Sequence, residues 1–190
     1  GVDYFDYYLL HNLGVNHYNI AEKYKAFDFI GKKKAEGKIK KIGFSFHDTA
    51  DLLDKILCDH PEAEFVQLQI NYLDWNNDSI QSRKCYETAV RHGKPVIVME
   101  PVKGGALANI PFAAENLFKS YAPEASVASW AIRYAASLEN VIMVLSGMSD
   151  MKQLLDNTSN MQHFNPMTKE EFAVVKKAVD IINSSIAIPC

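Results

Sequence analysis

The fold assignment starts from the stretch YFDYYLLHN, from Tyr4 to Asn12. Its aromatic and aliphatic residues predict a buried strand, yet the run ends in an imidazole and an amide, His11 and Asn12. A histidine at a strand end is often a structural group whose ring nitrogens are hydrogen-bonded. In parallel α/β folds, the carboxyl ends of strands are also where catalytic and binding side chains lie.

Strand-like and helical segments alternate along the rest of the chain. We expect strands at 5–11, 40–46, 64–72, 94–101 and 140–147. We expect helices at 21–37, 49–60, 80–93, 122–138, 149–160 and 168–185, and a glycine-containing loop at 103–111. Thr49 and Ser149 are predicted to open their helices, Pro123 to stand near a helix start, and Thr168 and Glu171 to form a capping box.

This alternation predicts a parallel α/β architecture with five strand–helix units. Two folds satisfy it: a self-contained flavodoxin-like open sheet, and strands 4 to 8 of a TIM (β/α)8 barrel. A whole barrel takes about 250 residues, so 190 residues would supply only part of one. The chain also opens directly in a strand pattern without methionine, and we expect a single domain, 1–190, taken from a longer protein.

Composition excludes several classes of protein. The formal net charge is -3, which provides no basic field for nucleic acid. No segment is long and apolar enough to span a membrane, so a cytoplasmic protein is expected. The three cysteines are too few and too scattered for a disulfide framework, and Cys58 and Cys85 are expected to be buried or partly buried thiols within helices.

Each predicted strand ends in polar residues, which predicts a pocket where the carboxyl ends converge. These residues include His11, Asn12, Ser45, His47, Gln67, Gln69, Asn71, Glu100, Lys103, Ser146 and Ser149. The histidines lack tight spacing with cysteine or carboxylate, so no metal cluster is expected. No nucleophile elbow is present, and the amide, hydroxyl and imidazole groups that remain suit the binding and polarisation of a carbonyl.

The stretch SGMSDMKQLLDN, residues 146–157, indicates anion binding. Gly147 and Ser149 stand at a helix start, where backbone N–H groups favour phosphate. Asp156 and Asn157 follow on a similar helix face and suit an adenosine moiety. A capped surface helix without a ligand is the alternative interpretation.

Taken in order, these segments resemble the aldo-keto reductase family. The resemblance rests on DYFDYYLLHN, GKIKKIGFSFHD, FVQLQINYLDW, VIVMEPVKGGAL and VIMVLSGMSDMKQLLDNTS, which are similar to its fourth to eighth barrel strands. The closest resemblance is to the branch with a C-terminal ferredoxin-like 4Fe-4S domain. In that branch Cys190 would be the first iron–sulfur ligand, with the cluster itself in the parent protein.

The resemblance implies an NADP(H)- or NAD(H)-dependent reductase of a small aldehyde or ketone. His11 would orient the carbonyl. The residues implied in cofactor binding are Ser45, Gln67, Met99, Glu100, Val102, Gly104, Gly147, Ser149, Gln153, Asp156 and Asn157. Phe46 departs from the family's second amide-binding asparagine, and no arginine stands near the phosphate position, where Lys152 would have to serve.

A second departure concerns the proton donor. The family's catalytic tyrosine, lysine and aspartate belong to barrel units that have no counterpart in this sequence. The resemblance therefore implies that these 190 residues alone are inactive. A nicotinamide-binding regulatory module without turnover is the alternative. A partial barrel would also expose apolar residues such as Val66, Ile97 and Val144, which predicts self-association or pairing with a separate amino-terminal segment.

Overall fold

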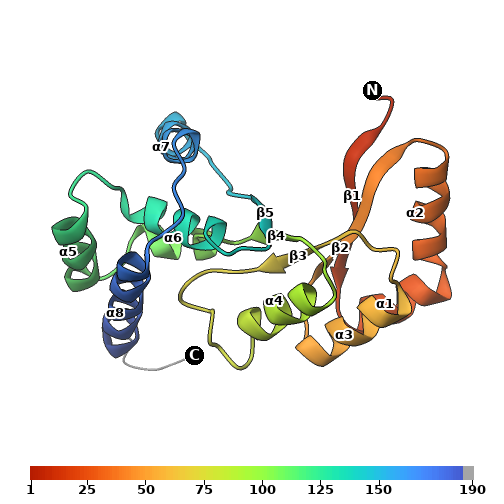
Figure 1. Cartoon of the computed structure of the whole chain (residues 1–190), viewed down its shortest axis with the longest axis horizontal. Helices are drawn as coiled ribbons and strands as arrows, with labels where there is room; N and C mark the ends of the chain where they lie inside the picture. Colours follow the sequence, from red (N-terminus) through yellow and green to blue (C-terminus); the bar gives the residue numbers. More distant parts are fainter. Residues whose placement is uncertain (186–190) are drawn as a thin grey trace. The chain divides into compact units, whose positions relative to one another are not determined.

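The computed structural model describes residues 1–185, and this part of the chain forms two compact units (Figure 1). Unit 1 contains Gly1–Gln69 and Asp74–Val98. Unit 2 contains Ile70–Leu73 and the chain from Met99 onward. None of the helices in residues 1–185 combines the length and the apolar character needed to cross a membrane.

Unit 1 is built on a sheet whose strands follow their order in the sequence, β1-β2-β3-β4. These are β1 (Phe5–Leu13), β2 (Ile39–Phe46), β3 (Phe65–Gln69) and β4 (Val96–Met99), whose last residue already belongs to unit 2. The pairs β1–β2 and β2–β3 are parallel. A flavodoxin-like sheet has the order 2-1-3-4-5, so the sequential order found here agrees with consecutive units of a barrel instead.

Four helices connect these strands: α1 (Val15–Lys23), α2 (Ala26–Ala35), α3 (Ala50–Asp59) and α4 (Ser82–Arg91). The prediction of one helix at 21–37 was wrong. Lys25 adopts a left-handed φ of 52°, which ends α1 and starts α2, and α2 packs against β2 (Figure 1). The cap at Thr49 is confirmed, because its hydroxyl accepts a hydrogen bond from the backbone N–H of Leu52.

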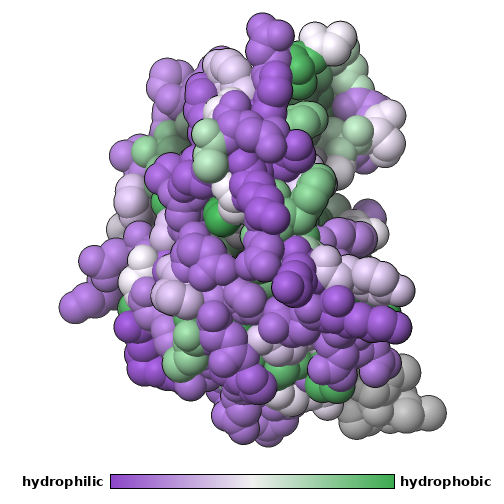
Figure 2. Space-filling view, turned by 90° about the vertical axis from the view of Figure 1, so that its right-hand side faces the viewer, coloured by the Kyte–Doolittle hydropathy of each residue, from purple (hydrophilic) through white to green (hydrophobic). Residues whose placement is uncertain are grey.

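The exposure of side chains in unit 1 differs from two expectations. Val66 and Ile97 are 0% and 3% exposed, so they are not the open apolar face that a partial barrel predicted. Cys85 is buried as expected, and burial raises the pKa of its thiol to about 12, whereas Cys58 is exposed. Exposed apolar side chains of unit 1 include Tyr4, Phe5, Tyr7 and Tyr8 at the start of the chain. Figure 2 shows a mainly hydrophilic face with separated apolar patches.

Unit 2 contains one strand, one 3-10 helix and four α-helices among its described residues. They are β5 (Val141–Val144), η1 (Lys103–Ala108), α5 (Phe112–Tyr121), α6 (Val127–Ala136), α7 (Met151–Gln162) and α8 (Lys169–Ser185). Helix α5 was not predicted, and the expected loop at 103–111 is largely η1. Helix α6 starts after Ser126, whose hydroxyl accepts the Ser129 N–H, and not near Pro123. Asp150, and not Ser149, caps α7.

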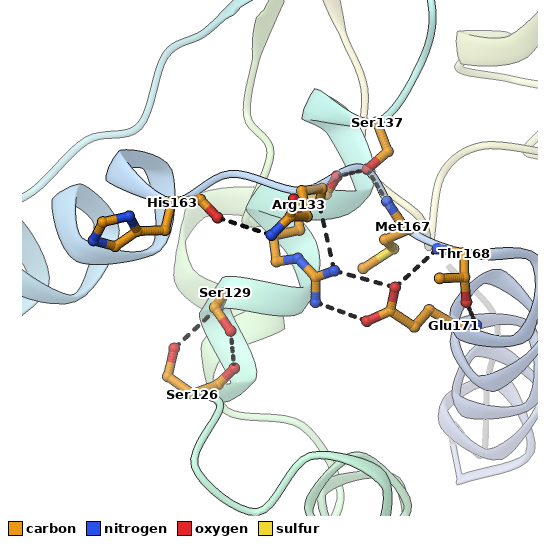
Figure 3. A network of polar contacts seen from close by, with 9 residues as sticks. Ser126, Ser129, Arg133, Ser137, His163, Met167, Thr168 and Glu171 are labelled. Atoms are coloured by element: carbon orange, nitrogen blue, oxygen red, sulfur yellow. Dashed lines mark hydrogen bonds and ion pairs between the residues drawn. The ribbon is translucent and has the colours of Figure 1, made fainter.

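The core of unit 2 forms around stacked aromatic rings. The rings of Phe118 and Trp130 lie 4.5 Å apart and almost parallel. The predicted capping box of α8 is confirmed: the Thr168 N–H donates to Glu171, and the Glu171 N–H donates to the Thr168 hydroxyl. Glu171 also forms an ion pair with Arg133 of α6, which joins the two helices (Figure 3).

Glu64 in unit 1 carries the first testable prediction. Burial alone would raise the pKa of its carboxyl group, but hydrogen bonds from Lys34, Lys41 and the Ile42 N–H outweigh burial and lower the pKa to about 2. We expect Glu64→Gln to reduce the free energy of unfolding at pH 7 by about 2 kcal/mol. This is less than the full pKa shift would give, because both lysines are more than one-third exposed.

The stability lost in Glu64→Gln should become smaller as the pH falls. A carboxyl group with a lowered folded-state pKa stabilises the protein above its ordinary value of 4.5, and this stabilisation disappears as the pH falls toward 2. Urea unfolding at a series of pH values should therefore show the variant and the original chain converging in acid. Glu36→Gln, which removes an exposed pair with Lys33, should cause no measurable change. A Glu64→Gln effect that is independent of pH would contradict the assignment.

Candidate functional site

In unit 1, His11 and Asn12 lie in an irregular part of β1. The pairing of β1 with β2 shifts register between Leu10 and Leu13, and Asn12 has a left-handed φ of 58°. Bulges of this kind redirect side chains and are frequent beside active sites. His11 is exposed to solvent. The strand in the opening stretch is thus distorted where its two polar residues stand.

Two further predicted residues lie at the same end of the sheet. Ser45 of β2 and Gln67 of β3 are direct register partners. Ser45 is fully buried, and its hydroxyl oxygen accepts a 2.7 Å hydrogen bond from the Asn12 N–H. Phe46, at the position of the missing asparagine, is 2% exposed. The structure therefore brings the end of β1, Ser45 and Gln67 together, as convergence of parallel strand ends requires.

Unit 2 contains a cavity of about 390 Å³ formed by residues that follow β4 and β5 and by α7. This volume lies in the range of small-molecule sites. Eight residues that the sequence implicated in cofactor binding line it: Glu100, Val102, Gly104, Gly147, Ser149, Gln153, Asp156 and Asn157. Met99 is half-buried at the end of β4 and is not among the lining residues.

The start of α7 is held by side-chain hydrogen bonds within the cavity wall. The N–H of Ser149 donates to the side-chain oxygen of Gln153 over 2.8 Å. Asn157 donates to the Ser146 hydroxyl over 3.2 Å. These contacts orient the predicted polar residues along the cavity wall. Helix α7 is capped by Asp150 and none of its residues is buried, so the structure also fits the alternative of a capped surface helix without a ligand.

Asp156 is anchored to a second helix start. The hydroxyl of Ser126, which caps α6, donates a 2.6 Å hydrogen bond to one carboxylate oxygen of Asp156. The amide of Asn160 donates to the other oxygen over 3.2 Å. Ala128, in the first turn of α6, lines the cavity. The positive ends of two helix dipoles, those of α6 and α7, are therefore associated with this wall.

The loop after β4 approaches the cavity with an unusual backbone. Glu100 and Lys103 have left-handed φ values of 55° and 50°, followed by Gly104 and Gly105 at 59° and 94°. The buried amide of Asn71 donates to the carbonyl oxygen of Glu100 over 3.4 Å and helps to hold this conformation. Left-handed conformations in non-glycine residues are uncommon and cluster at ligand sites.

The residues that line the cavity carry no positive charge that would bind phosphate strongly. Its lining residues include the carboxylates of Glu100 and Asp156 and no lysine or arginine. Lys152, the cation expected to serve a phosphate, is exposed on α7 and does not belong to the lining. Any phosphate bound here would depend on backbone N–H groups and helix dipoles.

Sequence patterns did not identify several contributors. Residues of the lining that were not predicted are Pro101, Ala108, Ala128 and Leu145. Ala128 and Ser126 come from α6, whose start was misplaced at Pro123, and the N-cap preference of serine was the signal available for it. Cys190, the predicted iron–sulfur ligand, lies outside the described residues.

The sequential strands, the polar strand ends and the cavity beside two helix starts define an α/β protein with a candidate small-ligand site. Comparison with protein families identifies the family to which the chain belongs. The model of the aldo/keto reductase family matches residues 1–180, and the chain belongs to this family. No match was found among curated proteins.

Several solved structures share the fold of this chain. The holo form of an aldo-keto reductase from Bacillus halodurans is 23% identical, with a TM-score of 0.71, over 93% of this chain and 59% of its own. An aldo/keto reductase from Klebsiella pneumoniae in complex with NADP and acetate is 22% identical, with a TM-score of 0.68, over 92% and 59%. The glycerol dehydrogenase of Gluconobacter oxydans is 18% identical, with a TM-score of 0.70, over 100% and 62%. The chain thus spans about three-fifths of the length of these structures.

Proposed function

We propose that this chain is the cofactor-binding, carboxyl-side part of a nicotinamide-dependent carbonyl reductase. The observation that carries the proposal is the unit 2 cavity, where eight residues implicated by the family resemblance line one space. Membership of the aldo/keto reductase family supports it, as do two similar Klebsiella pneumoniae structures described as complexes with NADP and with NADPH.

Within unit 2, the cavity would hold the adenosine and phosphate part of the dinucleotide. The first turns of α6 and α7 offer backbone N–H groups to phosphate, and the loop at Gly104 allows close approach of the backbone. Asp156 is hydrogen-bonded to Ser126 and Asn160, and Asn157 to Ser146, so these side chains are already oriented. An oriented carboxylate suits a ribose hydroxyl better than an additional phosphate.

Within unit 1, the end of the sheet would serve the carbonyl side. A bound nicotinamide supplies the hydride for the carbonyl carbon. His11 would donate a ring N–H to the carbonyl oxygen, and its place in the irregular part of β1 leaves it exposed to a substrate. The Ser45 hydroxyl accepts a hydrogen bond from Asn12 and has its own proton left to donate; because Ser45 is fully buried, a carboxamide oxygen would take that proton only after the backbone at Asn12 moves aside. Gln67, its register partner, would complete that contact.

The 190 residues alone are proposed to bind the dinucleotide without turnover. The family resemblance assigns the proton-donating tyrosine and its lysine to barrel units without a counterpart here. General acid catalysis typically contributes about 10² to 10⁴ in rate, so its loss would remove most of the carbonyl reduction. A fuller barrel in an iron–sulfur protein, with Cys190 as a cluster ligand, belongs to the same proposal for the parent.

Fluorescence titration with NADPH, and with NADH in parallel, tests the cofactor site. We expect saturable binding that Gln153→Ala weakens at least about tenfold, because Gln153 lines the cavity and holds the Ser149 N–H. Gln162→Ala, at the exposed end of the same helix, is the matched control and should leave binding unchanged. NADH is included because the lining has no cationic side chain for the additional phosphate of NADPH.

The outcomes separate the parts of the proposal. Binding that is insensitive to Gln153→Ala would place the dinucleotide outside this cavity. A chain that is folded by circular dichroism but binds neither cofactor would reject the proposed site. Carbonyl reduction by these 190 residues at the rate of a complete reductase would reject the proposed dependence on a missing proton donor.

A further inference from the structure

Three potential metal ligands of unit 1 lie close together on helix α3 and just after helix α4. They are Asp54, Cys58 and His92, whose ligand atoms all lie within 4.8 Å of one another. Sequence spacing did not predict a metal site, because Cys58 and His92 are far apart in the chain. The packing of α3 against α4 brings them together.

Helical geometry explains two of the three positions. Asp54 and Cys58 are four residues apart on α3, so their side chains project from the same face one turn apart. His92 follows the last residue of α4, where its backbone N–H donates to the Thr88 carbonyl oxygen over 3.1 Å. Its ring nitrogen Nε2 lies 2.8 Å from Oδ1 of Asp54. The imidazole is therefore already directed at the carboxylate.

We propose that Asp54, Cys58 and His92 bind a divalent transition-metal ion of the Zn²⁺ type that links α3 to α4. A thiolate, an imidazole and a carboxylate together match the preferences of Zn²⁺. Ca²⁺ and Mg²⁺ require mostly oxygen ligands, and this cluster offers one carboxylate. Water would take the fourth position of a tetrahedral site.

The geometry requires only side-chain adjustment. Tetrahedral Zn²⁺ with bonds of about 2.0 to 2.3 Å places its ligand atoms roughly 3.4 Å apart. The present upper limit of 4.8 Å leaves at most about 1.4 Å to close, which rotation about the χ angles of the exposed Cys58 and the half-buried Asp54 and His92 can supply. The ion would replace the Asp54–His92 hydrogen bond and coordinate both groups. Cys58 is exposed, so the thiol is accessible to an ion from solvent.

One neighbouring cation opposes binding without blocking it. A guanidinium nitrogen of Arg91 lies 3.5 Å from Oδ1 of Asp54 and also donates to the Thr88 hydroxyl over 3.0 Å. The Arg91 side chain is 61% exposed and can move away from an incoming ion. Removing this positive charge should therefore strengthen metal binding, which distinguishes a real site from an accidental grouping.

Titration of the metal-free chain with Zn²⁺ tests the site, with the affinity measured by competition against a fluorescent chelator. We expect one strong site per chain, weakened at least about tenfold by Cys58→Ser and by His92→Gln, since even outer-shell partners typically contribute that much. Arg91→Gln should bind Zn²⁺ more tightly. Asp51→Asn on the same helix should bind Zn²⁺ as the original chain does, and it controls for nonspecific binding to surface carboxylates.

Cobalt provides an independent spectroscopic readout. Co²⁺ bound to a thiolate should give a near-ultraviolet charge-transfer band and visible bands of tetrahedral intensity, and Cys58→Ser should abolish the former. Zn²⁺ should also raise the thermal unfolding midpoint of the original chain and not that of Cys58→Ser. A Zn²⁺ affinity unchanged in both Cys58→Ser and His92→Gln, or a cobalt complex without a thiolate band, would overturn the proposal. Neither result depends on dinucleotide binding.

Discussion

Gly43→Ala is expected to destabilise the chain by at least about 3 kcal/mol, or to prevent unit 1 from folding. Gly43 lies in β2 as the direct register partner of Phe65 in β3. A Cβ atom at Gly43 would lie 2.4 Å from the backbone carbonyl oxygen of Phe65, and 2.7 and 2.8 Å from two atoms of its ring. The ring could move, but the carbonyl belongs to the sheet backbone. Relief would require separation of β2 from β3.

The substitution Gly43→Ala should also disturb the candidate site, because Gly43 lies close to Ser45 in β2. Gly43 is two residues before Ser45, and the pairing of β2 with β3 also sets Ser45 opposite Gln67. Separation of β2 from β3 would therefore displace Ser45 and Gln67, the two residues proposed to contact the carboxamide. Glycine inside a strand commonly marks such a close approach of two backbones.

Urea unfolding followed by circular dichroism measures the effect, and Gly31→Ala is the matched control. Gly31 lies inside α2, and a Cβ atom there would meet nothing within 4 Å. Alanine at Gly31 should stabilise the helix by about 0.5 to 1 kcal/mol. The two substitutions add the same methyl group and should act in opposite directions. A Gly43→Ala chain as stable as the original would show that β2 and β3 do not approach as described.

Arg133→Met is expected to cost about 3 kcal/mol in unfolding free energy, the second large effect. Two guanidinium nitrogens of Arg133 contact the two carboxylate oxygens of Glu171 at 2.9 and 3.1 Å (Figure 3). The two side chains are 19% and 12% exposed, so removal of the arginine leaves a largely buried carboxylate without its charge partner. The pair joins α6, which carries Ala128 of the cavity wall, to α8.

The pH dependence of this variant has a defined sign. Burial alone would raise the pKa of Glu171, but the bonds from Arg133 and the Thr168 N–H lower it below its ordinary value. The stabilisation is therefore present above the unfolded-state pKa of about 4.5 and is lost as the pH falls through the folded-state pKa. The difference in stability between the original chain and Arg133→Met should shrink over the same range.

Thermal and urea unfolding at pH 7 and at lower pH values measure both effects. Lys119→Met removes the exposed Lys119–Glu115 pair of α5 and should produce no measurable change. The double variant Arg133→Met, Glu171→Leu should recover part of the loss, because it leaves no buried charge unpaired. Equal destabilisation by Arg133→Met and Lys119→Met would contradict the importance assigned to burial.

Local chemistry in the sequence was sufficient for several features. The Thr168–Glu171 box and the Thr49 cap were predicted because each depends on residues within one helical turn. Ser149, Gln153, Asp156 and Asn157 were grouped correctly along one wall because they belong to one short segment. Periodicity also predicted the five strands and most of the helices in their order, but it merged α1 with α2 and missed η1 and α5.

Other features depended on contacts that no local pattern contains. Whether 21–37 forms one helix or two was decided at Lys25, whose left-handed backbone separates α1 from α2 so that α2 can pack against β2. The burial of Val66 and Ile97 depends on the side chains that cover them in the folded unit. The start of α6 at Val127 depends on Ser126, which bonds to Asp156, thirty residues later in the chain.

The amino-acid sequence alone determined the five strands, most of the helices and the polar character of the strand ends, because helix periodicity, capping and strand patterning act over a few residues. Tertiary structure alone decided which distant side chains meet. The anchoring of Asp156 by Ser126 and the meeting of Cys58 with His92 both require helices to pack in a particular register. Packing energy is a property of whole surfaces, and so these two groupings appear only in the folded chain.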